Sequence, residues 1–196
     1  MQHLDVLHAA RSLFDAAVPP GFQYRDDFIT AAEEAALAGE IGLVEFSTFE
    51  MRGAVARRRV AFFGRSYDNN ATPPIPEFLR PLRERAGAWA GVDPQTFAMA
   101  LINEYRAGAP IGWHRDAPQY DFVCGISLLS SCRMTFRPYV SPGAHASTKG
   151  PRRATHEITL ERRSAYLMTA ESRNAYEHHI PAVDALRYSI TFRTLR

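Results

Sequence analysis

The feature that most constrains this chain is a change in its hydrophobic pattern near residue 97. From there to the C-terminus, apolar and polar residues alternate with a period of two, in short runs separated by glycine, proline and serine. Six runs share this pattern: AMALINEY, DFVCGISLL, RMTFRPY, HEITL, SAYLMTA and LRYSITFRTLR. Many short strands in succession favour a sandwich or jelly roll over a doubly wound sheet, in which helices would separate the strands.

The N-terminal half carries helix signals instead. Residues 4–14 have the apolar spacing of a short amphipathic helix. The motif Thr30-Ala-Ala-Glu33 is a capping box, which is typical of the start of a second helix. Pro76 stands at the first turn of a third helix, whose apolar residues then recur at helical spacing. We therefore expect helices before the strand-rich part.

Length and composition fit one globular domain. The chain has 196 residues, of which 46% are hydrophobic and 22% charged, so a disordered or fibrous protein is not expected. We predict a single α+β domain over residues 1–196. Its core is a double-stranded β-helix, or jelly roll, formed by residues 97–196, and the helices of residues 1–96 pack on one of its sheets.

Several classes of protein are excluded by what the sequence lacks. No apolar run reaches the roughly 18–20 residues that a membrane-spanning helix needs. The start has no basic segment followed by an apolar stretch, so we expect no secretion signal. Cys124 and Cys132 are too few for a zinc framework or a disulfide scaffold. We therefore expect a cytoplasmic protein without membrane contact, and we expect it to be a monomer.

The net charge of +2 hides a local basic stretch. All basic residues except Lys149 are arginine, a bias that a GC-rich genome would also produce. Residues 51–65 nevertheless combine five arginines with no acidic residue. The overlapping stretch ARRRVAFFGRSYDNN interleaves arginine with aromatic rings, a mixture that suits nucleic acid. If this stretch is extended, Phe62 and Phe63 point to opposite faces, so at least one of them belongs to the core.

Three of the seven histidines are candidate metal ligands. His114 and Asp116 are two residues apart, and on extended backbone such side chains project from the same face. One strand end would then supply an imidazole and a carboxylate to the same ion. A distal histidine, His178 or His179, would complete a set of two histidines and one carboxylate, which leaves open positions on Fe(II). The alternative is an exposed loop in which His114 and Asp116 pair with each other.

The C-terminal strand has one apolar and one polar face. Tyr188, Ile190 and Phe192 form the core face. The other face carries Arg187, Ser189, Thr191 and Arg193. A buried arginine needs an anionic partner, which is either a structural carboxylate or a bound dicarboxylate held by charge-assisted hydrogen bonds. Asn103 and Tyr105 share a face of an earlier strand and are placed to help hold the same acid.

The order of these motifs resembles the AlkB family of 2-oxoglutarate- and Fe(II)-dependent dioxygenases. The set comprises Asn103-Glu-Tyr105, His114-Arg-Asp116, a distal histidine and the run from Arg187 to Arg193. The resemblance implies Fe(II) bound by His114, Asp116 and His178, because the family usually uses the first histidine of such a segment, with Ile-Pro following. It also implies that Arg187 and Tyr105 grip the distal carboxylate of 2-oxoglutarate, and that Asn103 and Arg193 assist at its chelating end. Ser189 takes the place of a common asparagine, so that contact would be weaker or water-mediated.

The resemblance further implies oxidative demethylation or dealkylation of alkylated bases in DNA or RNA. The reaction would consume O2 and 2-oxoglutarate and release succinate, CO2 and formaldehyde. The basic, aromatic stretch would then form a nucleotide lid, in which Arg58, Phe62, Arg65 and Tyr67 are candidate contacts to single-stranded nucleic acid. Two alternatives stay open: the same iron chemistry on a protein side chain or small molecule, and a non-catalytic binding module with the same fold.

Overall fold

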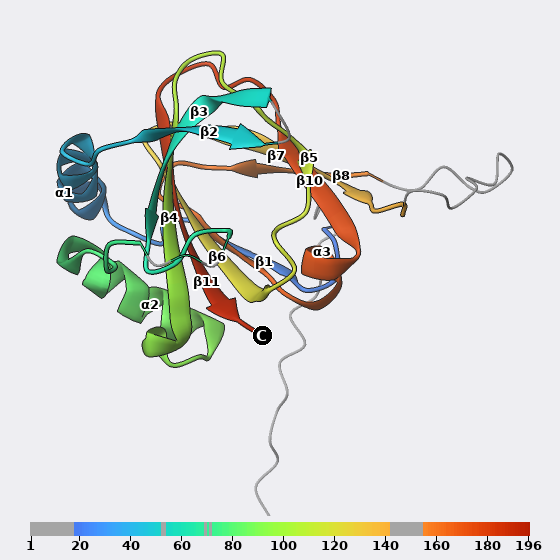
Figure 1. Cartoon of the computed structure of the whole chain (residues 1–196), viewed down its shortest axis with the longest axis horizontal. Coiled ribbons are helices and arrows are strands. Elements are labelled where there is room, and N and C mark those ends of the chain that lie inside the picture. The colour runs from blue at the N-terminus through green and yellow to red at the C-terminus, as the bar shows by residue number, and fades with distance from the viewer. Residues whose placement is uncertain (1–17, 52–53, 69, 71, 142–154) are drawn as a thin grey trace, which may run out of the picture.

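Two antiparallel sheets face each other in the computed structural model, which describes residues 18–51, 54–68, 70, 72–141 and 155–196 (Figure 1). The large sheet has the order β1 (Phe22–Arg25), β9 (Ala165–Met168), β6 (Tyr120–Leu128), β11 (Arg187–Leu195), β4 (Phe97–Tyr105), β3 (Ala54–Phe63), β2 (Ser47–Met51). The small sheet has the order β5 (Ile111–His114), β10 (Tyr176–Ile180), β7 (Cys132–Pro138), β8 (His156–Leu160). This is the predicted jelly roll, in which strands distant in sequence pair as neighbours.

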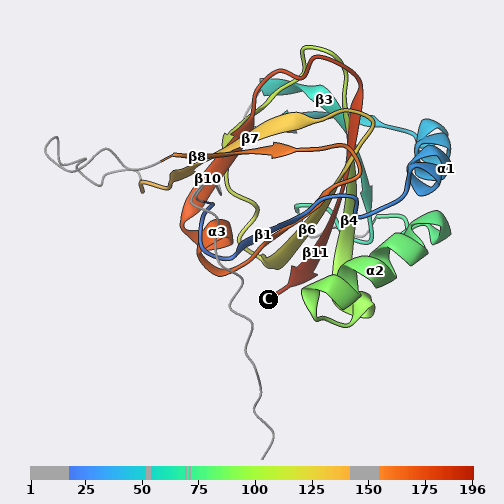
Figure 2. The ribbon, with the colours of Figure 1, turned by 180° about the vertical axis from the view of Figure 1, so that it is seen from behind.

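The helices cover the outer face of the large sheet. They are α1 (Ala31–Gly42) and α2 (Arg80–Ala90), which is preceded by the 3₁₀ turn η1 (Glu77–Leu79) and followed by η2 (Pro94–Thr96). Figure 2 shows α1 and α2 on the same side of the strands, away from the small sheet. Ile41 of α1 and Leu82 of α2 share one buried cluster with the sheet residues Ile102 and Ile190. The prediction that helices pack on one sheet is therefore confirmed.

The predicted capping box opens α1. The Glu33 backbone N–H donates to the Thr30 hydroxyl (3.2 Å), and the Thr30 backbone N–H donates to the Glu33 carboxylate (2.8 Å). At the other end of the helical layer, α2 stops at Gly91, whose φ of 69° lies in the left-handed region that glycine adopts without strain. Both helix boundaries thus follow from local chemistry.

The N-terminal part is less helical than we predicted, because it also contributes three strands to the large sheet. In β3, arginines occupy positions on both faces and obscure the alternation that marks a strand. As expected for extended backbone, Phe63 packs on the cluster under the helices, whereas Phe62 packs on a separate cluster that includes Val60. The predicted helix over residues 4–14 lies outside the described residues.

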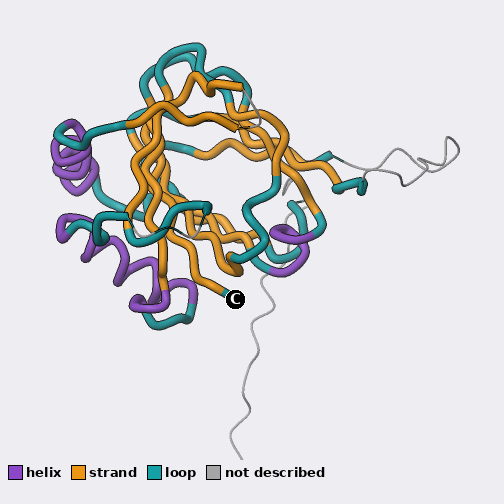
Figure 3. The backbone as a smooth tube through the Cα atoms, in the orientation of Figure 1, coloured by secondary structure: helices purple, strands orange, loops and turns teal. Residues whose placement is uncertain are grey.

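Short elements close the ends of the fold. The strands β5 and β10 and the five-residue helix α3 (Ala170–Asn174) were not predicted, since each is too short to show a period. Figure 3 shows the strands as two layers, with helices α1 and α2 outside one of them. A second apolar cluster, which includes Val123, Phe136 and Leu160, fills part of the space between the sheets. In the described part of the chain, no helix is long and apolar enough to cross a membrane.

Candidate functional site

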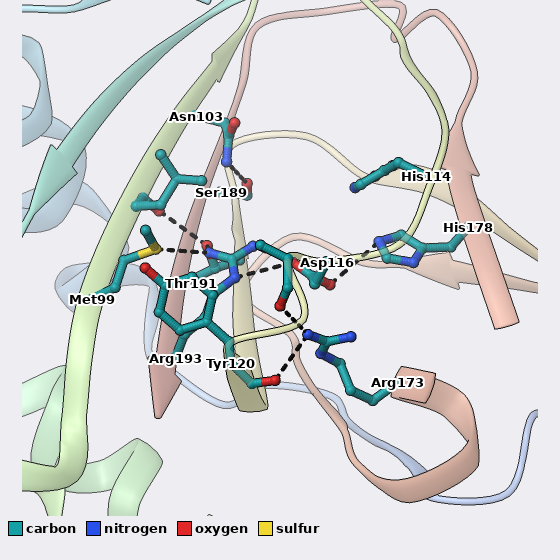
Figure 4. Close-up of polar contacts among 12 residues, drawn as sticks. Met99, Asn103, His114, Asp116, Tyr120, Arg173, His178, Ser189, Thr191 and Arg193 are labelled. Atoms are coloured by element: carbon teal, nitrogen blue, oxygen red, sulfur yellow. Dashed lines mark hydrogen bonds and ion pairs between the residues drawn. The ribbon is translucent and has the colours of Figure 1, made fainter. Parts of the chain in front are cut away.

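Strand pairing in the small sheet brings the candidate histidines together. β5 and β10 are antiparallel neighbours, and His114 pairs directly with His178. Their ring centroids are 4.3 Å apart. Asp116 follows β5 by two residues, and its Oδ2 lies 4.0 Å from Nε2 of His178. Figure 4 shows both imidazoles reaching toward this carboxylate.

Alternation along β10 separates the two histidines that the sequence left as alternatives. His178 is 6% exposed and faces the space between the sheets. His179 faces the other way, and its ring centroid lies 4.1 Å from that of Trp113. Only His178 therefore lies beside His114 and Asp116.

One carboxylate oxygen of Asp116 is hydrogen-bonded and the other, in the portion of the chain that the structure describes, is not. Its Oδ1 accepts hydrogen bonds from Nε (3.0 Å) and Nη2 (2.7 Å) of Arg193. Its Oδ2 is buried and has no hydrogen-bond partner among the described residues. Burial is the largest single influence and acts to raise the pKa of this carboxyl, but the surrounding groups, of which Arg193 has the largest effect, together hold the pKa below the usual range. The group is therefore an ionised carboxylate with a lone oxygen aimed at the histidines.

Both histidines are neutral. Burial lowers the pKa of His178 to about 3, and it also lowers the pKa of His114. The Nδ1 of His114 lies 2.9 Å from the carbonyl oxygen of Gly112. That carbonyl fixes the proton on Nδ1, so the lone pair of His114 is on Nε2.

Two neutral imidazoles and one carboxylate are the donor set that Fe(II) accepts in mononuclear oxygenases. In their present rotamers, no three histidine, cysteine or acidic side chains of the described ranges surround one point at metal-binding distance. The backbone register already places the two histidines directly opposite each other. The free Oδ2 of Asp116, buried without a partner within those ranges, is the observation that fits a cation at this position.

A second unsatisfied group lies on β11. Arg187 is 1% exposed, and its Nε donates to the Ser127 hydroxyl (3.1 Å). Its Nη1 is buried and has no hydrogen-bond partner within the described part of the chain. The guanidinium carbon lies 5.1 Å from the ring centroid of Tyr105. A buried cation with free donors is a site for an anion, because leaving it unpaired is costly.

Polar side chains from three adjacent strands extend the polar region around Arg187. Asn103 of β4 donates from Nδ2 to the Ser189 hydroxyl on β11 (3.4 Å). Its Oδ1 accepts from Nε of Arg58 on β3 (3.2 Å). Arg58, only 7% exposed, was predicted to contact substrate rather than this amide. The serine at position 189 is thus bound directly to Asn103.

One cavity between the sheets joins these groups. Ten of the twelve predicted site residues line it: Arg58, Tyr67, Asn103, Tyr105, His114, Asp116, His178, Arg187, Ser189 and Arg193. Phe62 is not among the lining residues but packs behind Tyr67, with the ring centroids 5.2 Å apart. Arg65 is not among them either. Tyr166 lines the cavity and was missed by the sequence reasoning, although its alternation within β9 places it on the inner face.

The sequence profile of the 2OG-Fe(II) oxygenase superfamily matches residues 46–193. The chain is an AlkB-like member of this superfamily. It is therefore a dioxygenase that uses Fe(II), 2-oxoglutarate and O2, and the predicted family resemblance is confirmed.

Two relatives in Arabidopsis thaliana have related sequences. The alkylated DNA repair protein ALKBH8 homolog is 26% identical over 94% of this chain and 58% of its own length. The RNA demethylase ALKBH9B is 27% identical over 62% of this chain and 24% of its own length. This AlkB-like chain thus spans less than two thirds of either relative.

Solved structures show the same fold at low sequence identity. OsALKBH1 superposes with a TM-score of 0.63 at 14% identity, covering 91% of this chain and all (100%) of that one. A Pseudomonas putida prolyl-4-hydroxylase superposes with a TM-score of 0.58 at 12% identity, covering 90% and 93%. At these identities the AlkB-like chain shares their architecture, and substrate is a separate question.

Proposed function

We propose that this dioxygenase oxidatively removes alkyl groups from bases of single-stranded DNA or RNA. The observation that carries the proposal is one cavity holding two unsatisfied, oppositely charged groups, the Asp116 Oδ2 and the Arg187 Nη1. A cation and a dicarboxylate together would satisfy both. The products would be succinate, CO2 and formaldehyde, and the role would be DNA repair or RNA demethylation by a cytoplasmic monomer.

In this proposal His114, Asp116 and His178 hold Fe(II). When bound, the iron couples the decarboxylation of 2-oxoglutarate by O2 to oxidation of the alkyl group. The protein's own part is positional. Arg193 occupies the Asp116 Oδ1, so Asp116 offers one oxygen to the metal and leaves coordination positions free for cosubstrate and O2.

Arg187 and Tyr105 would receive the distal carboxylate of 2-oxoglutarate. The free Nη1 of Arg187 donates to that carboxylate, while Ser127 already fixes the orientation of the guanidinium through Nε. Asn103, which is held in place by its hydrogen bond to Ser189, would assist together with Arg193 at the opposite, chelating end.

The substrate class has separate support. Arg58 and Tyr67 line the cavity, and Tyr67 forms an aromatic cluster with Phe62 and Phe49. Aromatic faces beside a cation suit a stacked base and its phosphate. Arg65 would contact the backbone of the strand. The names of both Arabidopsis relatives, which refer to alkylated DNA repair and RNA demethylation, point to the same class.

A substrate screen tests the proposal. The iron-loaded protein is incubated with 2-oxoglutarate and with methylated DNA, RNA or peptides, and formaldehyde and succinate are measured. We expect formaldehyde from a single-stranded oligonucleotide, its loss in Asp116→Ala, and its retention in Asp184→Ala, an exposed acidic residue outside the cavity. Formaldehyde from peptides alone would refute the nucleic-acid substrate and favour a protein side chain.

A further inference from the structure

The side chain of Tyr166 crosses the neighbouring strand β6 to reach the cavity, at a position where β6 carries a glycine. It pairs with Gly125 of β6, and Gly125 pairs on its other side with Thr191 of β11. A Cβ added to Gly125 would lie 2.2 Å from Cζ and 2.5 Å from the hydroxyl oxygen of Tyr166. The phenol therefore lies directly over the backbone of Gly125, and only glycine permits this.

The ring is held in this position by packing. Phe22 of β1 stacks on it, with ring centroids 5.9 Å apart and planes inclined by 12°. Tyr166 is 6% exposed and lines the same cavity as Asp116 and Arg187. Its hydroxyl is thus a fixed, desolvated donor.

The charges around this hydroxyl place it between the two ends of the site. Burial is the largest influence and raises the pKa of Tyr166, and Asp116 raises it further. Arg193 and Arg187 act in the opposite direction. The charges of the metal end and of the Arg187 end, which line the same cavity as Tyr166, therefore both act on this phenol.

Tyr166 lines the cavity, and its hydroxyl makes no hydrogen bond to another group within the ranges that the structure describes. A hydroxyl that opens on a cavity of this kind is available to hydrogen-bond a bound ligand. The neighbouring Tyr24, which pairs with Tyr166 across β1 and β9, shows the usual arrangement: its hydroxyl accepts from the Glu161 backbone N–H at 3.0 Å. The free donor of Tyr166 points to a ligand that bears an acceptor.

We propose that Tyr166 contacts the cosubstrate, donating its hydroxyl to a carboxylate oxygen of 2-oxoglutarate between Arg187 and Asp116. This inference rests on the proposed cosubstrate site. Gly125 is its structural counterpart, since a side chain there would displace the phenol from the cavity. The same hydroxyl would contact the carboxylates of succinate until the product leaves.

The test is 2-oxoglutarate binding to Tyr166→Phe loaded with Mn(II), measured by calorimetry. A hydrogen bond to a charged group is lost while the ring packing remains, so we expect Kd to rise about tenfold or more. KM for 2-oxoglutarate rises by the same factor, whereas kcat at saturating cosubstrate changes little. Tyr24→Phe is the matched control, because it removes a hydroxyl outside the cavity, and its Kd stays at the wild-type value.

Arg187→Gln distinguishes a wrong role for Tyr166 from a wrong cosubstrate site. If it weakens binding and Tyr166→Phe does not, the role of Tyr166 is wrong and the site stands. If neither variant changes Kd, the proposed cosubstrate site is itself wrong. Tyr166→Phe could also lose affinity for 2-oxoglutarate because the fold is weakened. If the fall in Tm of the ligand-free protein is then much larger for Tyr166→Phe than for Tyr24→Phe, the hydroxyl is structural and the inference is overturned.

Discussion

Arg187→Met tests whether the guanidinium is kept for a ligand rather than for the fold. In the ligand-free protein this side chain is fully buried, donates a hydrogen bond to Ser127 and contacts the Tyr105 ring. Its Nη1 has no partner among the described residues. Methionine fills a similar volume without a charge, so the substitution removes an unsatisfied group and leaves no large cavity.

The magnitude follows from the contacts that change. An unpaired buried charge costs several kcal/mol after the protein relaxes. Against this, the bond to Ser127 contributes about 1 kcal/mol and the contact with Tyr105 about 1–2 kcal/mol. We expect Arg187→Met to stabilise the ligand-free protein by about 1–2 kcal/mol, which is roughly 2–8 °C in Tm for a chain of this length. Loss of two charge-assisted hydrogen bonds should weaken 2-oxoglutarate binding by roughly 10²–10⁴-fold.

Thermal unfolding with Mn(II), with and without 2-oxoglutarate, measures both effects. Wild-type protein gains about 4 kcal/mol at a cosubstrate concentration of a thousand times its Kd, and Arg187→Met gains about 1.4 kcal/mol or less at the same concentration. Arg106→Met is the matched control, because Arg106 is 70% exposed and pairs with Glu104 at the surface. A lower Tm for ligand-free Arg187→Met, or an undiminished response to 2-oxoglutarate, would refute the reasoning.

Four further outcomes are expected. His178→Ala weakens Mn(II) binding more than about 100-fold, whereas His179→Ala keeps wild-type affinity; equal effects in a metal titration would contradict the assignment. Arg193→Lys keeps the charge but loses the two-donor grip on its carboxylate, so the same titration shows binding about 10–100-fold weaker. Burial raises the pKa of Cys124 to about 12, so iodoacetamide at neutral pH leaves it unmodified until denaturant is added, as mass spectrometry will show. An arginine hydrogen bond and the cap of α1 lower the pKa of Glu33 to about 2, so its stabilisation is present above the unfolded value near 4.5 and is lost as pH falls toward 2. Glu33→Gln should therefore show a smaller loss of Tm than wild type over that range.

The strands that carry long alternating runs were predictable, and the elements that complete the site were not. β4 and β11 have nine residues each, and the alternation of their sequences was enough to indicate Asn103, Tyr105 and Arg187 on the polar faces. β5 and β10 have four and five residues, too few for a period, so the pairing of His114 with its distal partner had to come from the register.

The basic stretch shows a different limit. Its composition predicted a nucleic-acid contact, but pattern alone does not distinguish an exposed arginine from one that faces a cavity. Arg59 is held at the surface by Glu104, with a 2.7 Å contact. Its neighbour Arg58 turns inward to Asn103, and Phe62 supports Tyr67 from behind. Because side chains alternate along β3, Arg59 forms an ion pair with Glu104 while the adjacent Arg58 faces the site.

Arg193 shows why recognising a motif correctly does not determine what each of its residues contacts. The sequence placed this cation near the cosubstrate, and the structure joins it to Asp116 through two hydrogen bonds and to the Thr191 hydroxyl through a third, of 2.8 Å. A carboxylate desolvated this completely would otherwise take up a proton and lose its value as a ligand. The guanidinium keeps it ionised and, by taking one oxygen, turns the other toward His178. In the proposed metal site, Arg193 would therefore act on the metal through Asp116, and its effect on the cosubstrate would follow from where that aspartate holds the iron.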